Sequence, residues 1–476
     1  MHSAQTNTSF YWHDYETFGI NPATDRPAQF AGIRTDSELN IIGEPLELYC
    51  KVPTDYLPQP QACLITGITP QKANRLGLPE SEFIQRIHQE FSQPGSCIIG
   101  YNNIRFDDEV TRNLLYRNFY DPYTYSYQKG NSRWDLLDVV RACYALRPDG
   151  IEWPTDEETG DPVFKLERLS AANGLEHANA HDAVSDVMVT IEFARLIRKA
   201  QPRLFDYLFK QRGKKEVSEL MDMQSLKPFV HVSGMIPAAQ GCVTWMSAVG
   251  RHPLQQNAII CVNLAKDITP LIELNVEELK AALYTPRQDR AEDHPEVPVK
   301  LIHTNKCPVV APASTLSEER AEELGINRAQ CRTSLNLLRD NLTLIRTKLT
   351  ELYDEGYETP DHQDPDRMIY SGGFFSAQDK QQFAIIHRLT PEALAEQAFE
   401  FQDPRLKEML FRYRARNYPY TLKESELARW QSHRQDYFEQ HSQPFILELE
   451  NQLQQYTDDE HKSGVLKALY HYAEGL

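Results

Sequence analysis

The sequence reads Phe10-Tyr11-Trp12-His13-Asp14-Tyr15-Glu16-Thr17-Phe18-Gly19 near its start, with two carboxylates one residue apart directly after a short apolar run. Side chains of a β-strand point alternately to opposite faces, so Asp14 and Glu16 point to the same side. Two acids that face one way raise each other's pKa, and burying them unpaired costs free energy. This pair therefore predicts a cation between the carboxylates, and Mg2+ is the oxygen-seeking ion that fits. Two solvated acids on an exposed strand are the commoner cause of an isolated Asp-x-Glu.

Two further segments place acids next to apolar elements. One reads Asn102-Asn103-Ile104-Arg105-Phe106-Asp107, and the other runs from His177 to Asp186 and contains His181. Taken alone, each segment can be explained without a catalytic site. The acid run 107–109 is typical of a solvated face or a helix N-terminus, and His181-Asp182 is typical of helix capping. Four acids and a histidine in this order outweigh those explanations.

These segments resemble the three motifs of the DEDD superfamily of 3'-to-5' exonucleases, as Asp14-x-Glu16, Asn102-x3-Phe106-Asp107 and His181-x4-Asp186. The last spacing is that of the histidine branch of the superfamily, since the tyrosine branch would show Tyr-x3-Asp. Three longer strings are more specifically similar to the bacterial exonuclease I family, which degrades single-stranded DNA. They are His13 to Gly19, Gly100 to Asn103 and Tyr413 to Asn417, and the similarity runs over nearly the whole chain.

The resemblance implies a two-metal site with Asp14, Glu16, Asp107 and Asp186 as ligands of two Mg2+ ions, for which Mn2+ could substitute. Asp14 would contact both ions, Glu16 and Asp186 one site, and Asp107 would act through water or the second ion. Two ions about 4 Å apart relieve charge on the attacking and leaving oxygens of a phosphodiester. His181 would be the general base for the attacking water, and its near-neutral pKa suits that role.

Basic and aromatic side chains interleave between Arg105 and Arg147. Single-stranded nucleic acid is bound by such a mixture, with cations for phosphates and rings for bases. Core packing is the alternative for each ring. A second basic cluster, Arg212-Gly213-Lys214-Lys215, could guide a strand, although lysine clusters are commonly only solvated. The candidates for substrate contact are Glu16, Arg112, Tyr123, Tyr127, Arg141, Lys165 and Lys214, of which Lys165 depends on the resemblance.

Composition limits the classes of protein. A chain of 476 residues exceeds a single core, so two or three domains are expected. The net charge of −18 argues against a general polyanion binder, so DNA would need a local basic path.

The eight cysteines contain no C-x2-C pair, which indicates free thiols in a reducing cytoplasm. His177 and His181 form a His-x3-His spacing, but no glutamate follows His177, so zinc is disfavoured. No signal-like or long apolar segment appears, which predicts a soluble protein without membrane contact.

The succession of strand-like and helical patterns along the sequence predicts three domains. Strand-like runs at 10–12, 30–33, 46–50 and 97–100 alternate with helical patterns at 83–91 and 182–198, which indicates an α/β domain over residues 1–201. Short β-branched runs at 229–232, 258–263 and 297–303 predict a β domain with helical insertions over 202–355. An acidic, proline-containing linker at 355–365 precedes helical patterns at 377–389, 404–416, 423–441 and 444–474, which predict a helical C-terminal domain over 356–476. By resemblance, the first domain has a ribonuclease H-like fold with a mixed central sheet, and the second is SH3-like.

We expect a metal-dependent exonuclease that digests single-stranded DNA from the 3' end to 5'-mononucleotides, in DNA repair and recombination. An RNA-directed exonuclease of the same branch is one alternative, because the acids recognise a phosphodiester and not a sugar. A non-catalytic single-strand-binding subunit on a nuclease-like fold is another, and loss of a motif acid would favour it. The resemblance also implies a partner, the single-stranded-DNA-binding protein, whose acidic C-terminal tail suits basic pockets. Candidates for that contact are Arg147, Tyr207 and Arg339, and nothing demands more than a monomer.

Overall fold

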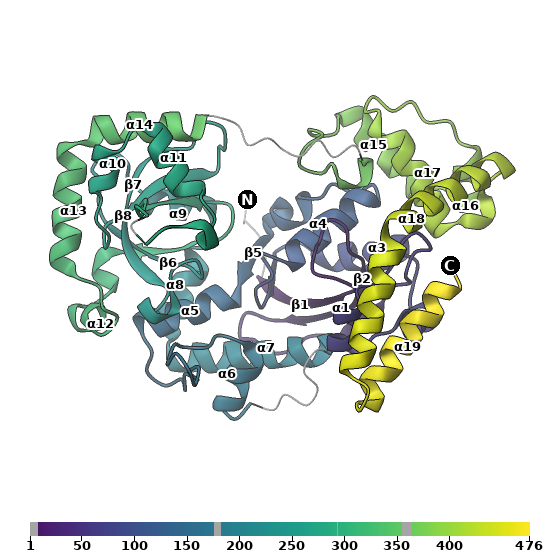
Figure 1. Cartoon of the computed structure of the whole chain (residues 1–476), viewed down its shortest axis with the longest axis horizontal. Coiled ribbons are helices and arrows are strands. Elements are labelled where there is room, and N and C mark those ends of the chain that lie inside the picture. The colour runs from purple at the N-terminus through teal and green to yellow at the C-terminus, as the bar shows by residue number, and fades with distance from the viewer. Residues whose placement is uncertain (1–7, 176–181, 293, 355–363) are drawn as a thin grey trace, which may run out of the picture. The chain divides into compact units, whose positions relative to one another are not determined.

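The computed structural model describes residues 8–175, 182–292, 294–354 and 364–476. These residues form two compact units, which are described separately. The first unit contains residues up to 133, the start of the helix near residue 183, and the chain after the linker. The second unit contains residues 134–175 and 192–354. Figure 1 labels their elements.

A five-stranded mixed sheet organises the N-terminal part of the chain, as expected. The strand order is β3-β2-β1-β4-β5, so the strand that carries Asp14 and Glu16 is central. This strand pairs antiparallel with β2 and parallel with β4. The bounds are β1 (Ser9–Thr17), β2 (Pro27–Thr35), β3 (Leu46–Tyr49), β4 (Ser96–Gly100) and β5 (Ser132–Asp135). The four strand-like runs read from the sequence are therefore confirmed.

Helices of the first unit come from both ends of the chain. The helix α7 (Ala183–Ala200) begins in this unit and continues into the second. The others are α1 (Pro60–Thr66), α2 (Pro70–Leu76), α3 (Glu80–Phe91), α4 (Asp107–Arg117), α15 (Ala377–Ile386), α16 (Pro391–Glu396), α17 (Arg405–Asn417), α18 (Glu424–Gln455) and α19 (Glu460–Glu474). In Figure 1, α18 and α19 lie beside α1, although more than 350 residues separate them in sequence.

The C-terminal helices share two cores with the N-terminal part of the chain. In one, Phe18 and Cys63 pack with Leu449 and Leu466. In the other, Phe119 and its neighbours pack with side chains of α15 and α17. A fragment that ends near residue 202 would expose both apolar faces, so we expect it to lose stability and not only its C-terminal domain.

The break predicted between the helical patterns at 423–441 and 444–474 is wrong, because α18 runs through residues 442 and 443 and through Pro444 without interruption. Proline lacks a backbone N–H and removes one helical hydrogen bond. Phe445 and Leu449 directly after it are buried in the core shared with α1, and this packing holds the helix together. The chain instead turns after α18 at Tyr456, and the side chain of Asp459 caps α19 by accepting a hydrogen bond from the Lys462 N–H.

The second unit contains a five-stranded antiparallel sheet, which confirms the expected β character of the middle region. Its order is β10-β6-β7-β8-β9. The strands are β6 (Phe229–Val232), β7 (Val243–Arg251), β8 (Ala258–Asn263), β9 (Val299–His303) and β10 (Val309–Pro312). The helices are α5 (Leu136–Leu146), α6 (Leu166–Ala172), α8 (Pro202–Lys210), α9 (Lys214–Leu220), α10 (Thr269–Glu273), α11 (Val276–Tyr284), α12 (Glu318–Glu323), α13 (Arg328–Asp340) and α14 (Leu342–Asp354).

Two expectations from composition can be compared with the structure. All eight cysteines are free thiols, as predicted. Within the described residues, no helix combines the length and the apolar character that a membrane span requires.

Candidate active site

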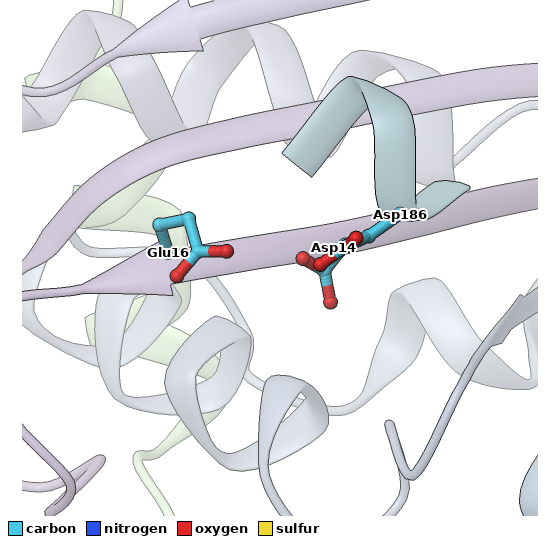
Figure 2. A group of neighbouring side chains, drawn as sticks. All are labelled: Asp14, Glu16 and Asp186. Atoms are coloured by element: carbon cyan, nitrogen blue, oxygen red, sulfur yellow. The ribbon is translucent and has the colours of Figure 1, made fainter. Parts of the chain in front are cut away.

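Three carboxylates from two elements converge at the centre of the mixed sheet. Asp14 and Glu16 project from β1, and Asp186 projects from the first turn of α7. Figure 2 shows these three side chains, with Asp14 and Asp186 close together. Carboxylate oxygens of the three residues lie within 4.8 Å of one another, and each side chain is half-buried. The prediction that Asp14 and Glu16 face one side is confirmed, and they are not two solvated acids on an exposed strand.

The fourth predicted acid is tied to the same strand. Asp107 is the first residue of α4 and is 4% exposed, and its Oδ1 accepts a hydrogen bond from the backbone N–H of Tyr15 at 3.1 Å. The connection from β4 into α4 starts with a close approach, since a Cβ on Gly100 would lie 2.7 Å from the carbonyl oxygen of His13. Glycine at this position lets the chain pass β1 and bring Asp107 to the acids.

Burial and mutual repulsion make these acids hard to ionise. Burial raises the pKa of Asp14 well above its usual value, and Asp107, Glu16 and Asp186 raise it further. Burial, with Asp186, Asp107 and Asp182, raises the pKa of Glu16 to about 8. A divalent cation compensates such a group directly, so the acids fit the metal site that the motif predicts.

The plain explanations for the other two segments can now be judged. Residues 107–109 form the first turn of α4, so the helix N-terminus explanation is confirmed. The solvated-face explanation is wrong, because Asp108 is 1% exposed and paired with Arg133, and Glu109 pairs with Arg112 at 2.6 Å. The capping explanation holds for Asp182, whose Oδ1 accepts a hydrogen bond from the Ser185 N–H at 3.2 Å. His177 and His181 lie outside the described residues.

The substrate-contact candidates of the first unit lie on and near α4. Arg112 is 8% exposed, pairs with Glu109, and its guanidinium lies 5.6 Å from the ring centroid of Tyr123. Tyr123 is half-buried, whereas Tyr127 is 62% exposed. The structure therefore places Arg112 next to Tyr123. Arg112 also forms an ion pair with Glu109. Contact between these residues and DNA stays a prediction.

The candidates of the second unit are spread over three helices. Arg141 on α5 pairs with Asp138 at 2.8 Å. Lys165 is exposed and directly precedes α6, and Lys214 is the exposed first residue of α9, where its Nζ donates to Asn257 Oδ1 at 2.5 Å. Their contacts with DNA also remain predictions.

Sequence reasoning missed two exposed aromatic residues that lie beside Tyr123 and Glu109. Phe374 is 87% exposed and its ring centroid lies 6.0 Å from that of Tyr123, and Tyr370 is 57% exposed and donates a hydrogen bond to Glu109. Arg405 braces their loop by donating to the carbonyl oxygens of Met368 and Gly373 at 2.8 and 3.1 Å. The string Gly372-Gly373-Phe374-Phe375 was the available signal, since aromatic residues next to paired glycines are unusual in a linker.

A group of acids on the central strand of a mixed sheet, with an acid on a helix beside them, fits an enzyme that hydrolyses phosphate esters with divalent metal ions, the class to which nucleases belong. Comparison with protein-family models agrees. Residues 11–194 match the model described as "Exonuclease", residues 212–355 the exonuclease I SH3-like domain, and residues 363–476 the exonuclease I C-terminal domain.

Individual relatives give the particular family. The chain is 51% identical over 477 residues to exodeoxyribonuclease I of Escherichia coli strain K12, and the match covers 100% of both chains. The crystal structure of the zinc-bound form of an E. coli ExoI–ssDNA complex superimposes with a TM-score of 0.94 and 52% identity, covering 98% of this chain and 99% of that one. A crystal structure of SSB/exonuclease I with the inhibitor CFAM gives a TM-score of 0.91 and 50% identity, covering 99% and 100%. The chain belongs to the exonuclease I family and is an exodeoxyribonuclease.

The predicted fold class is confirmed: a ribonuclease H-like exonuclease domain, an SH3-like domain and a C-terminal domain. The regions that match the family models lie inside our domain bounds of 1–201, 202–355 and 356–476, and the bounds themselves stay predictions.

Proposed function

We propose that this exodeoxyribonuclease digests single-stranded DNA from the 3' end and releases 5'-mononucleotides, in DNA repair and recombination. The observation that carries the proposal is the convergence of Asp14, Glu16 and Asp186 within 4.8 Å, with Asp107 hydrogen-bonded to the same strand. No motif acid is missing, which disfavours a non-catalytic binding subunit. The similarity to a solved complex with single-stranded DNA supports the choice of substrate.

Asp14, Glu16, Asp107 and Asp186 are the proposed ligands of two Mg2+ ions, with Mn2+ as a substitute. The ions would relieve charge on the attacking and leaving oxygens of the phosphodiester. The chain contributes a pre-arranged group of acids, fixed by β1, by the backbone hydrogen bond to Asp107 and by the capped start of α7. Because these elements hold the acids in place, little reorganisation is needed when substrate arrives.

Replacing His181 by alanine is expected to slow the chemical step by about a hundredfold or more, because general-base catalysis contributes at least this factor. The affinity for DNA should change little. Single-turnover hydrolysis and equilibrium binding of a labelled strand separate the two quantities. His177→Ala in the same segment is the control and should retain activity. Equal losses of rate and affinity in His181→Ala would assign the residue to binding or structure instead.

Tyr123, Tyr370 and Phe374 are the proposed stacking surface for unpaired bases. Phe374→Ala and Tyr123→Ala are each expected to weaken single-strand binding by about 1 to 3 kcal/mol, because a base loses its aromatic partner. Neither change should alter the salt dependence of binding, whereas Arg112→Ala should reduce it. Binding of a labelled oligonucleotide at several salt concentrations measures both effects.

Tyr420→Ala is the matched control for Phe374→Ala, since Tyr420 is 70% exposed in the same C-terminal region and has no contact with Tyr123 or Glu109 among the described residues. It should leave affinity unchanged. Equal effects of the two substitutions would show that exposed aromatic residues contribute non-specifically.

Digestion of end-labelled DNA and RNA strands, with and without Mg2+, tests the proposed function as a whole. We expect loss of label from a 3'-labelled DNA strand only when metal is present, with slow or no digestion of RNA. Faster digestion of RNA would favour the alternative of an RNA-directed exonuclease. Binding without hydrolysis in Mg2+ and in Mn2+ would favour the non-catalytic subunit.

The single-stranded-DNA-binding protein is the proposed partner, supported by the similarity to the solved SSB/exonuclease I structure. The second unit has a surface pocket of about 330 Å3 with Trp245, Leu264 and Leu316 in its wall and Arg328 and Arg332 at its edge. A pocket lined by arginines suits an acidic tail. Arg147 reaches the same place by donating to the carbonyl oxygen of Thr315 at 3.0 Å.

Arg332→Ala is expected to weaken binding of an acidic tail peptide by about 1 to 2 kcal/mol, because one charge-assisted contact is lost. Fluorescence anisotropy of a labelled peptide measures the loss. Arg339→Ala, an exposed position further along α13, is the comparison that locates the contact. A loss confined to Arg339→Ala would move the contact away from the pocket.

We expect the protein to act as a cytoplasmic monomer.

A further inference from the structure

A second cavity of about 350 Å3 lies within the first unit, apart from the acids of the active site. Its wall contains side chains from the loop after β1, from the segment before α1, from the end of α4, and from α17 and α18. Those that the argument uses are Arg26, Arg412, Arg416, Arg367, Tyr437 and His441. The volume is in the range that small-molecule sites occupy.

Three buried arginines leave hydrogen-bond donors unused at this cavity. Arg26 donates only through Nη1, to Glu80 at 3.4 Å. Arg416 uses Nε and Nη2 on Asp55 and Asp366, and Arg412 uses Nε and Nη1. One terminal nitrogen of each guanidinium therefore makes no hydrogen bond within the described residues. These side chains are only 8 to 11% exposed, and all three line the cavity.

Five carboxylates also line the cavity, those of Asp25, Asp55, Asp364, Asp366 and Glu448. Asp55 accepts three charge-assisted hydrogen bonds from Arg416, at 2.8, 3.0 and 3.2 Å, and lies 3.4 Å from His433. Asp366 is 2.7 Å from Arg416 and 3.2 Å from Arg412. Asp364 lies 2.6 Å from Arg412 and 3.5 Å from Arg367, so three of the acids are paired with arginines, whereas Arg26, Arg412 and Arg416 retain donor nitrogens. A surplus of donors in a buried wall is suited to an anion with several acceptor oxygens.

Part of the cavity wall is aromatic. The rings of Tyr437 and His441 stack with centroids 4.2 Å apart and planes 14° apart, and Pro444 and Phe445 follow on the same helix. A planar heterocycle could add to this stack. The cavity therefore has a donor-rich end for oxygens and a ring-lined side for a base.

We propose that this cavity binds a phosphate monoester that carries a planar base, that is, a nucleoside 5'-monophosphate. The free terminal nitrogens of Arg26, Arg412 and Arg416 bind the phosphate, and half-exposed Arg367, which lies 3.5 Å from Asp364, adds a further guanidinium to the lining. Tyr437 and His441 stack against the base. This ligand has the chemistry of the product of the proposed reaction, so the cavity is a site at which released product can bind away from the metal acids. That the ligand is a product of DNA digestion rests on the proposed function, whereas its identity as a phosphate monoester with a planar base is inferred from the residues of the cavity.

Isothermal titration calorimetry of the full chain in EDTA tests the proposal, with dAMP as the probe. EDTA removes the metal that would bind dAMP at the active site, and Asp186→Ala should not change the affinity. Arg367→Gln should weaken dAMP binding about tenfold. His441→Ala should weaken dAMP several-fold and leave orthophosphate unchanged. Arg388→Gln, an exposed arginine of the same helical region that does not line the cavity, is the control and should bind normally.

Comparing the affinities for dAMP, orthophosphate and deoxyadenosine shows whether the cavity recognises the phosphate, the nucleoside or both. The proposal expects dAMP to bind more tightly than orthophosphate, and deoxyadenosine not to bind. Equal affinity for orthophosphate and dAMP would overturn the nucleoside part, and binding of deoxyadenosine would overturn the phosphate part. No heat from dAMP at millimolar concentration, in a preparation that digests single-stranded DNA normally, would overturn the site without affecting the proposed nuclease function. Thr24→Trp fills the cavity wall without removing a charge, and unchanged binding in that variant would place the ligand elsewhere.

Discussion

Replacing Asp186 by alanine is expected to remove nearly all hydrolysis of single-stranded DNA while the protein remains folded. Asp186 is one of three acids whose carboxylate oxygens lie within 4.8 Å of one another, and the proposed metal ions lose a ligand when it is removed. A retained rate above about a tenth of the wild type, a loss smaller than roughly 1.4 kcal/mol, would contradict the metal-site assignment. Initial rates on an end-labelled strand at saturating Mg2+ provide the measurement.

The same substitution has a second readout that separates a lost ligand from a lost fold. Asp186 raises the pKa of Asp14 and of Glu16, so its removal relieves repulsion in the metal-free protein. The midpoint of thermal unfolding in EDTA should therefore stay the same or rise. Stabilisation by Mg2+ should become smaller, because a weaker site gains less from ligand binding. A lower midpoint in EDTA would indicate that Asp186 supports the fold.

The site acids were accessible to sequence reasoning because their pattern is local. Two acids at positions i and i+2 of a strand must share a face, and Asp186 is recognised from the motif spacing His181-x4-Asp186 at the start of a helical pattern. What the sequence could not supply was the hydrogen bond from Tyr15 to Asp107, which joins residues 92 positions apart. The approach of Gly100 to β1 is equally a property of the folded sheet.

The C-terminal region shows where local signals fail. The sequence predicts two helices, at 423–441 and 444–474, yet α18 continues through Pro444 because Phe445 and Leu449 are held in a core shared with α1. Phe374 was overlooked because one exposed ring in a loop has no periodic pattern to reveal it. Its neighbour Tyr123 and its braced loop are contacts between distant parts of the chain. Tertiary packing decided both cases, and it is not encoded in any short window of sequence.

Arg416→Met is expected to destabilise the protein by about 3 to 5 kcal/mol, which is the usual cost of removing one partner from a buried ion pair. Arg416 lies between Asp55, at 2.8 Å, and Asp366, at 2.7 Å, and the two acids are 3% and 7% exposed. Without the guanidinium both charges would be buried and under-compensated. Urea unfolding at pH 7 measures the loss. Arg429→Met is the control, since Arg429 is 56% exposed and its pair with Glu408 should contribute less than about 1 kcal/mol.

The destabilisation by Arg416→Met should shrink as the pH falls. Burial would raise the pKa of Asp55 and of Asp366, but Arg416 outweighs burial and holds both pKa values well below their usual range. A carboxyl with a depressed folded-state pKa contributes stability above its unfolded pKa, and that stability is lost as the pH falls through the folded value. In the variant these acids can protonate at a higher pH and so lose their buried charge. The two proteins should therefore differ most near pH 7 and progressively less below about pH 4, where the unfolded aspartates also bind protons.

The pH series also separates the ion pairs from simple packing. Arg416 lies 5.9 Å from the ring centroid of Trp430, so methionine replaces some of its packing but none of its charge. A destabilisation that is independent of pH would assign the effect to lost packing and would contradict the role of the ion pairs. Glu80 contributes to the same difference, because Arg117 and Arg26 outweigh burial and lower its pKa to about 2, and Arg416 lowers it further. The pH-dependent difference between the two proteins therefore reports on Asp55, Asp366 and Glu80 together.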